Sequence, residues 1–196
     1  MHLAFDIFQG IGVAAAVGIR PFLPALVAGA LAAGDVELSF KHTDFSFLQK
    51  PVFLLIMVLG VLLLGALDRW LSGRTEEPRW VTYGLAVMSL AIGALFFGGE
   101  LARRHDPVVI GIIAGVICAA IGVLATRPLL ARVRGRLDRE AVGALPLITE
   151  AVATLGAALS IVAPPIGVIL LLALLWLMVA GRGREQQKYA GLRILR

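Results

Sequence analysis

One short stretch of the sequence combines a charge with backbone breakers inside an apolar run. Arg20 and Pro21 lie between Leu3 and Gly34, where nearly every neighbour is apolar. An arginine is costly in hydrocarbon, so its presence there indicates a functional site. Proline has no N–H and is favoured in the first turn of a helix, which predicts one helix ending near Gly18 and another beginning at Pro21. The free N–H groups of that helix start, beside the guanidinium, predict an anion-binding site.

Further charged residues are candidates for the same site. The dipeptide recurs as Arg127-Pro128, and Asp68 ends a later apolar run. Glu150 lies in what we expect to be the first turn of another helix. We predict the following substrate-binding residues: Arg20, Pro21, Arg127, Glu150 and Asp68. The arginines would attract an anion, and the two acids would couple its movement to a proton or cation.

Each candidate also has a structural interpretation. Arg20 could extend to the membrane interface, or it could pair with Asp6 or Glu150 inside a bundle. Asp68 and Glu150 could simply complement the helix ends at which they lie. We interpret the segment from Glu100 to Asp106 as a solvated turn.

The composition defines the class of protein that must position these residues. The chain has 196 residues, of which 59% are hydrophobic and 16% are charged, and its mean hydropathy is +0.91. Soluble domains are nearer half apolar and a quarter charged, so this sequence predicts an integral membrane protein. The length suits a single membrane domain over residues 1–196. Motifs of zinc proteases, P-loops and serine hydrolases are missing, so we predict no enzyme, no cofactor and no metal site.

The apolar runs predict an all-α, polytopic helical bundle. About 20 helical residues cross roughly 30 Å of hydrocarbon, and about six runs approach that length. These runs are Leu3–Gly18, Pro51–Leu67, Val81–Gly99, Val108–Thr126, Leu147–Val162 and Ile166–Ala180. The segment Pro21–Gly34 is too short to span, so it is either half of a broken helix or a re-entrant arm.

Basic residues predict the orientation of the bundle. Segments 69–79, 127–140 and 181–196 hold most of the lysines and arginines, and six crossings put them on one side with both termini. The positive-inside rule makes that side cytoplasmic, including the tail 182–196. If Pro21–Gly34 spans together with the loop after it, the N-terminus lies outside instead.

Two parts of the sequence suggest an internal repeat. Ile11-Gly12-Val13 followed by Arg20-Pro21 corresponds to Ile121-Gly122-Val123 followed by Arg127-Pro128. With three crossings in each unit, halves 1–100 and 107–181 would have opposite orientation, as in many small transporters. This pattern predicts a 3+3 inverted repeat whose N-terminal arm is broken or re-entrant.

Four further parts of the sequence have recognisable patterns. Pro128–Glu140 reads as a basic amphipathic helix on the cytoplasmic surface, where it would bind anionic lipid. Asp35–Lys50 is either a short hairpin or an interfacial loop anchored by phenylalanines. Pro164-Pro165 should end one span and begin the next. Gly111 and Gly115 form a GxxxG motif, which suits either packing within the chain or a homo-oligomer.

These residues carry a resemblance to a known family. The run from Gly18 through Arg20-Pro21 to Pro24, the span closing on Asp68, and Leu145-Pro146-Leu147 followed by Glu150 resemble the bacterial membrane family called domain of unknown function 4126. The chain departs from the family before Asp68, where another acidic residue is expected. The resemblance implies a polytopic protein of the bacterial inner membrane and no particular activity.

Two functions fit these observations. The first is a small transporter or permeation protein that handles an anionic solute or a lipid headgroup within the bilayer. The alternative is a non-transporting membrane scaffold or assembly partner, in which Gly115→Leu would break an oligomer. We expect no nucleic acid partner, because the excess of basic residues follows the pattern of membrane orientation.

Overall fold

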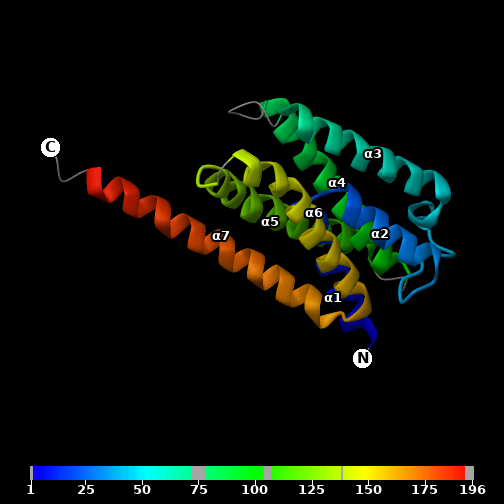
Figure 1. Cartoon of the computed structure of the whole chain (residues 1–196). Coiled ribbons are helices and arrows are strands. Elements are labelled where there is room, and N and C mark those ends of the chain that lie inside the picture. The colour runs from blue at the N-terminus through cyan, green and yellow to red at the C-terminus, as the bar shows by residue number, and fades with distance from the viewer. Residues whose placement is uncertain (1, 72–77, 104–106, 138, 193–196) are drawn as a thin grey trace.

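The computed structural model describes residues 2–71, 78–103, 107–137 and 139–192, and these ranges are almost entirely helical (Figure 1). The elements are α1 (His2–Ile19), α2 (Phe22–Ala33), a short 3-10 helix η1 (Ser46–Gln49), α3 (Pro51–Leu71), α4 (Arg79–Ala102), α5 (Val108–Arg134), α6 (Arg139–Val162) and α7 (Pro165–Leu192). The predicted all-α class is therefore confirmed.

Several of these helices have the length and composition of membrane spans. Within the described residues, four stretches are long and apolar enough to cross a bilayer: Pro51–Trp70, Arg79–Ala102, Val108–Arg134 and Ala141–Val162. Three further apolar helices are shorter, namely Ala4–Ile19, Phe22–Ala33 and Pro165–Gly181. These features are those of a helical membrane protein.

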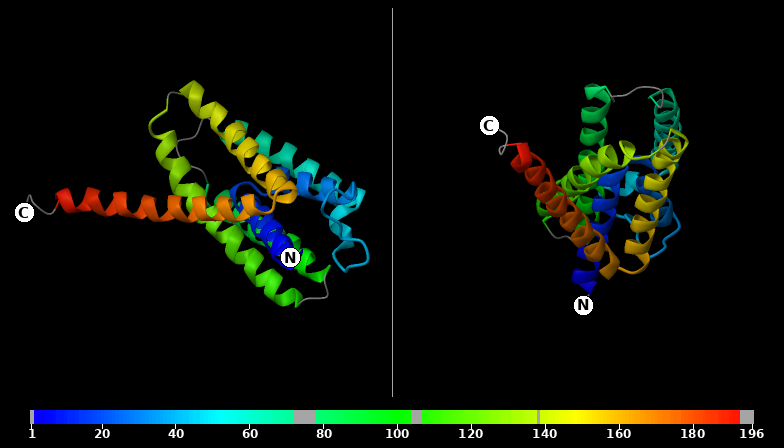
Figure 2. Two further views of the ribbon diagram at one scale, coloured as in Figure 1. Left: turned by 90° about the horizontal axis from the view of Figure 1, so that it is seen from below. Right: turned by 60° about the vertical axis from the view of Figure 1, so that its left-hand side comes forward.

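Helix α1 forms the centre of the bundle, in contact with α2, α4, α5, α6 and α7 (Figure 2). Every residue from Gly12 to Gly18 is buried, and all seven are glycine, alanine or valine. Side chains of this size let neighbouring backbones approach closely, as is common between membrane helices. A Cβ on Gly18, for example, would lie 2.9 Å from the Cα of Ala119 on α5.

The neighbours of α1 show in which direction each helix runs. On α4, Phe97 is close to Gly10, and Arg103, directly after α4, is close to Asp6, so α4 is antiparallel to α1. On α7, Gly167 lies against Gly12 and Leu174 belongs to the same buried cluster as Ala15, so α7 is parallel to α1. The start of α1 and the C-terminal part of α7 therefore lie at opposite ends of the bundle, and α7 projects beyond it (Figure 1).

The prediction of a separate surface helix over Pro128–Glu140 is wrong. Helix α5 continues through Pro128 to Arg134, and α6 begins at Arg139. A proline removes one helical hydrogen bond, but it does not end a helix already held by 20 preceding residues packed on α1 and α4. The dipeptide Arg127-Pro128 thus lies inside a helix, unlike Arg20-Pro21. Residue 138 and the side chains of residues 139 and 140 lie outside the described part of the chain.

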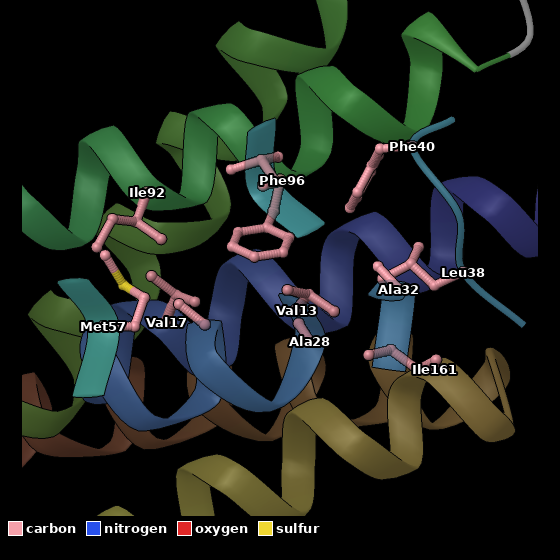
Figure 3. Close-up of a cluster of buried hydrophobic side chains, with 12 residues drawn as sticks. Val13, Val17, Ala28, Ala32, Leu38, Phe40, Met57, Ile92, Phe96 and Ile161 are labelled. Carbon is pink, nitrogen blue, oxygen red and sulfur yellow. The ribbon is translucent and has the colours of Figure 1, made fainter. Parts of the chain in front are cut away.

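The segment Asp35–Lys50 is not a hairpin, since it contains no strand and one turn of 3-10 helix. Instead Leu38, Phe40 and Leu48 are fully buried in the hydrophobic core. Figure 3 shows Leu38 and Phe40 among side chains from α1, α2, α4 and α6. The loop folds inward because burying these large side chains is worth more than leaving them at an interface.

The junction at Pro164-Pro165 is confirmed, because α6 ends at Val162 and α7 begins at Pro165. Pro165 has no N–H to donate to the carbonyl of Ile161, four residues earlier. The side-chain amide of Gln9, on α1, donates to that carbonyl instead, over 2.7 Å. Gln9 is 4% exposed, so this hydrogen bond lies in the interior.

We expect Gln9→Met to destabilise the protein by about 1–3 kcal/mol, because the Ile161 carbonyl would remain buried without a donor. Methionine has nearly the same shape, so the change removes the hydrogen bond with little change in packing. Thermal unfolding in detergent, followed by tryptophan fluorescence, measures the effect. An unchanged midpoint would show that the carbonyl finds another donor.

Candidate functional site

Arg20 lies in the two-residue link between α1 and α2, as predicted. Helix α1 ends at Ile19 and α2 begins at Phe22, with Pro21 in between at φ −75°. The backbone N–H of Arg20 still donates to the carbonyl of Ala16, 3.2 Å away. The helical hydrogen bonding of α1 therefore continues as far as Arg20 and is interrupted only after this residue. The residue is 7% exposed. A permanent charge is thus held inside the bundle, where it needs partners.

Those partners come from two distant helices. The Nη1 of Arg20 lies 3.2 Å from Oδ2 of Asp68 on α3, and its Nε lies 3.5 Å from Oε2 of Glu150 on α6. The Nε also donates to Oγ1 of Thr149, at 3.4 Å. We call Arg20, Asp68 and Glu150 the Arg20 cluster. Its side chains are 9%, 21% and 15% exposed, so all three are largely removed from solvent.

The Arg20 cluster does not have the net positive charge that is expected of a simple anion-binding site. One guanidinium faces two carboxylates, so the cluster has a formal charge of −1 when both acids are ionised. The backbone N–H of Leu23, in the first turn of α2, also faces the Glu150 carboxylate. The protein's own acids therefore already occupy the positive elements, which are the arginine and the helix start.

Glu150 reaches this place from the interior of its helix. The prediction that it lies in the first turn is wrong, because α6 begins at Arg139 and continues through Pro146. Its pairing with Arg20, one of the structural alternatives, is confirmed. The other alternative, Arg20 with Asp6, is wrong, since Asp6 lies near the opposite end of α1. Arg127 projects from α5, and its guanidinium donates to the backbone carbonyl of Thr82 on α4.

A second charged cluster was missed in the sequence. The Nη2 of Arg103 lies 3.0 Å from Oδ1 of Asp6 and 3.9 Å from Oε2 of Glu100. We call these three residues the Asp6 cluster. Glu100 is 2% exposed and belongs to α4, so the predicted solvated turn from Glu100 is wrong. Residues 104–106, in the rest of that segment, lie outside the described part of the chain.

The glycine motif serves packing within the chain. A Cβ on Gly115 would lie 2.8 Å from the Cα of Ala94, and one on Gly111 would lie 2.9 Å from the carbonyl oxygen of Phe97. Both contacts join α5 to α4. Of the two interpretations of this motif, the structure therefore supports helix packing inside one chain.

No group of three or more His, Cys, Asp or Glu side chains in the described ranges is placed to hold a metal ion. Comparisons with protein-family models, with curated proteins and with solved structures find no match to this chain. The class defined by fold and site is a helical membrane protein with a buried arginine–carboxylate cluster at a helix break. The resemblance to domain of unknown function 4126 stays a prediction.

Proposed function

We propose that the protein is a proton-coupled membrane transporter for an oxyanion, either a free solute or the phosphate of a lipid headgroup. The observation that carries this proposal is the burial of Arg20 at the break between α1 and α2, shared by Asp68 and Glu150. Ionisable side chains inside membrane bundles mark substrate, ion and proton pathways, so a buried arginine is a candidate for a functional site by default.

The proposed mechanism is an exchange of partners at Arg20. Uptake of one proton by Asp68 or Glu150 turns that carboxylate into a neutral acid, which weakens its hold on the guanidinium. Arg20, together with the N–H groups at the start of α2, can then bind an external oxyanion. The cluster and its oxyanion would then carry the same net charge as the ionised empty cluster. Release of the anion returns the proton and restores the ion pairs.

Helix α3 is the element best placed to separate from Arg20. It packs on α2 and η1, and many of its large apolar side chains are exposed. Asp68 therefore approaches Arg20 from the periphery of the bundle, whereas Glu150 belongs to a helix packed on α1, α2 and α7. A small shift of α3 would open the Arg20–Asp68 pair without disturbing the centre.

We further propose that the Arg20 end of the bundle faces the cytoplasm. Basic residues gather at this end, where α3 carries Arg69 in its last turn, α4 begins at Arg79 and α5 ends at Arg134. The positive-inside rule favours this side, and anionic lipid would bind here. Since α7 is parallel to α1, a seven-pass arrangement would put the N-terminus outside. This topology, in which α2 crosses the membrane together with the loop after it, replaces the topology with six crossings.

The inverted repeat stays a prediction, and the bacterial inner membrane stays the expected location.

Flux measurements on purified protein in proteoliposomes test the proposal. The first arm applies a gradient of inorganic phosphate and follows proton movement with a trapped pH-sensitive dye. The second arm follows transbilayer movement of a fluorescent phosphatidylglycerol. We expect protein-dependent flux in one arm and loss of it in Arg20→Gln. Its dependence on the proton gradient should be lost in Asp68→Asn or in Glu150→Gln, whichever acid takes up the proton.

The matched control is Arg136→Gln, which removes an exposed arginine outside the cluster and should leave flux unchanged. Equal flux in wild type and Arg20→Gln, or no protein-dependent flux in either arm, would overturn the proposal. The second result would favour the scaffold alternative.

A further inference from the structure

The Asp6 cluster has the same chemical makeup as the Arg20 cluster. Each holds one arginine between two carboxylates, so each has a formal charge of −1 when its acids are ionised. In the Asp6 cluster the side chains of Asp6 and Glu100 are 9% and 3% exposed, and that of Arg103 is 25% exposed. Its acids are therefore more deeply buried than those of the Arg20 cluster, while its arginine is nearer the surface.

The two clusters lie at opposite ends of the central helix. Residues 6 and 20 are separated by about 21 Å at the rise of an α-helix. Asp6 belongs to α1 itself, Glu100 lies in the last turn of α4, and Arg103 follows directly after that helix, which is antiparallel to α1. A line along α1 therefore runs from one cluster to the other across much of the thickness of a bilayer.

A buried polar group lies one turn from Asp6 on the same helix. Gln9 uses its side-chain nitrogen on the Ile161 carbonyl, but its Oε1 is buried and accepts no hydrogen bond from the described residues. Since positions i and i+3 are neighbours on a helix surface, Gln9 lies beside Asp6 on α1, although its amide nitrogen is bound to α6. A buried acceptor without a donor is a place where a water molecule or a protonated group can bind.

The described residues also show which other charged groups lie near the Asp6 end of the bundle. The parts of α5, α6 and α7 packed on the first half of α1 hold no ionisable side chain other than Cys118. The loop after α2 carries exposed Glu37, His42 and Asp44, along with Asp35. Hydrogen bonds from Lys41 and Ser39 lower the pKa of Asp35, which keeps it ionised. Among the residues that the structure describes, Arg103 is therefore the cation that pairs with Asp6 and Glu100.

We propose that the Asp6 cluster is a second proton-exchange site, at which Glu100, the more deeply buried acid and the farther from Arg103, takes up and releases a proton at the outer end of the transporter. This proposal rests on the proposed function, in which a proton is coupled to an anion at the Arg20 cluster. Protonation of one acid at each cluster gives both the same neutral state. A proton taken up at the outer end and released at the Arg20 end would move in the direction that drives anion uptake.

Infrared difference spectroscopy of the full chain in lipid nanodiscs tests the site without any substrate. Acidification from neutral pH should produce the carbonyl absorption of buried protonated carboxyl groups. We expect Glu100→Gln and Asp6→Asn each to remove part of this absorption, and Glu150→Gln to remove a different part. The matched control is Asp44→Asn, which removes an exposed carboxyl group and should leave the buried absorption unchanged.

Two variants at the Asp6 cluster keep the test decisive if one of them fails to fold. Spectra of Glu100→Gln and Asp6→Asn that match wild type would show a permanently ionised pair and overturn the proposal. Phosphate-driven flux in the same variants separates the two proposals. Loss of the infrared signal with no flux in wild type would leave the Asp6 cluster a proton site and reject the transporter. Flux in wild type with an unchanged infrared signal would reject only the second site.

Discussion

Arg20→Gln should destabilise the protein by about 3–5 kcal/mol, because it leaves two buried carboxylates without their cation. The guanidinium is held by Asp68 at 3.2 Å and by Glu150 at 3.5 Å, and each acid is at most about a fifth exposed. Water can therefore compensate only a small part of the lost interaction. Thermal unfolding in detergent micelles, followed by tryptophan fluorescence and by size-exclusion chromatography, measures this loss.

A combined variant separates charge from packing at the same place. Arg20→Gln with Asp68→Asn and Glu150→Gln replaces the charged cluster by neutral amides, which can hydrogen-bond with one another. Most of the lost stability should return, since no unpaired charge remains. If the triple variant is as unstable as the single one, packing and not charge explains the effect. If Arg20→Gln alone unfolds like wild type, the guanidinium is not buried in the membrane protein.

Gly115→Leu is expected to destabilise the fold by about 3 kcal/mol or more, at the upper end of the cost of overpacking a core. Even the first added carbon would lie 2.8 Å from the Cα of Ala94, and backbone atoms cannot rotate out of the way. The α4–α5 contact would have to separate along much of its length. Thermal unfolding should show a lower midpoint, and the yield of monodisperse protein should fall.

Gly84→Ala is the matched control on α4, because no atom lies within 4 Å of the Cβ it would add. Alanine is favoured over glycine inside helices by about 0.5–1 kcal/mol, so this variant should be at least as stable as wild type. If Gly115→Leu lowers the stability and Gly84→Ala does not, the loss comes from the close α4–α5 contact at Gly115 and not from the replacement of a glycine as such. A Gly115→Leu protein that keeps its unfolding midpoint but loses an oligomer would instead support the scaffold alternative.

Local signals predicted the breaks between helices well. Pro21 and Pro165 lack an N–H at positions where a helix begins, and the backbone chemistry at these points does not depend on distant residues. The apolar composition predicted a helical membrane bundle for a similarly general reason, since a bilayer leaves backbone polar groups no other partner. The prediction that Arg20 is a candidate for a functional site followed from the cost of its charge alone.

Distant contacts explain the predictions that were wrong. Pro128 resembles Pro21 in sequence, but α5 is packed along its length and continues, whereas the link at Arg20 is held open by Asp68 and Glu150. The pairing of Asp6 with Arg103 joins residues 97 positions apart, and no periodicity in either helix predicts it. A sequence signal did exist, because Glu100 and Arg103 are spaced to lie on one helix face.

The wide spacing of the Arg20 cluster along the chain has a consequence for biosynthesis. Arg20 is made before Asp68, which lies 48 positions later, and long before Thr149, which lies 129 positions later. A nascent chain that ends within α5 can neutralise Arg20 with Asp68, but it lacks the acid and the hydroxyl supplied by α6. The insertion machinery would therefore have to shelter the first helix hairpin from lipid until α6 is delivered. Co-translational assembly of this protein should be completed late, when α6 docks on the opening helices.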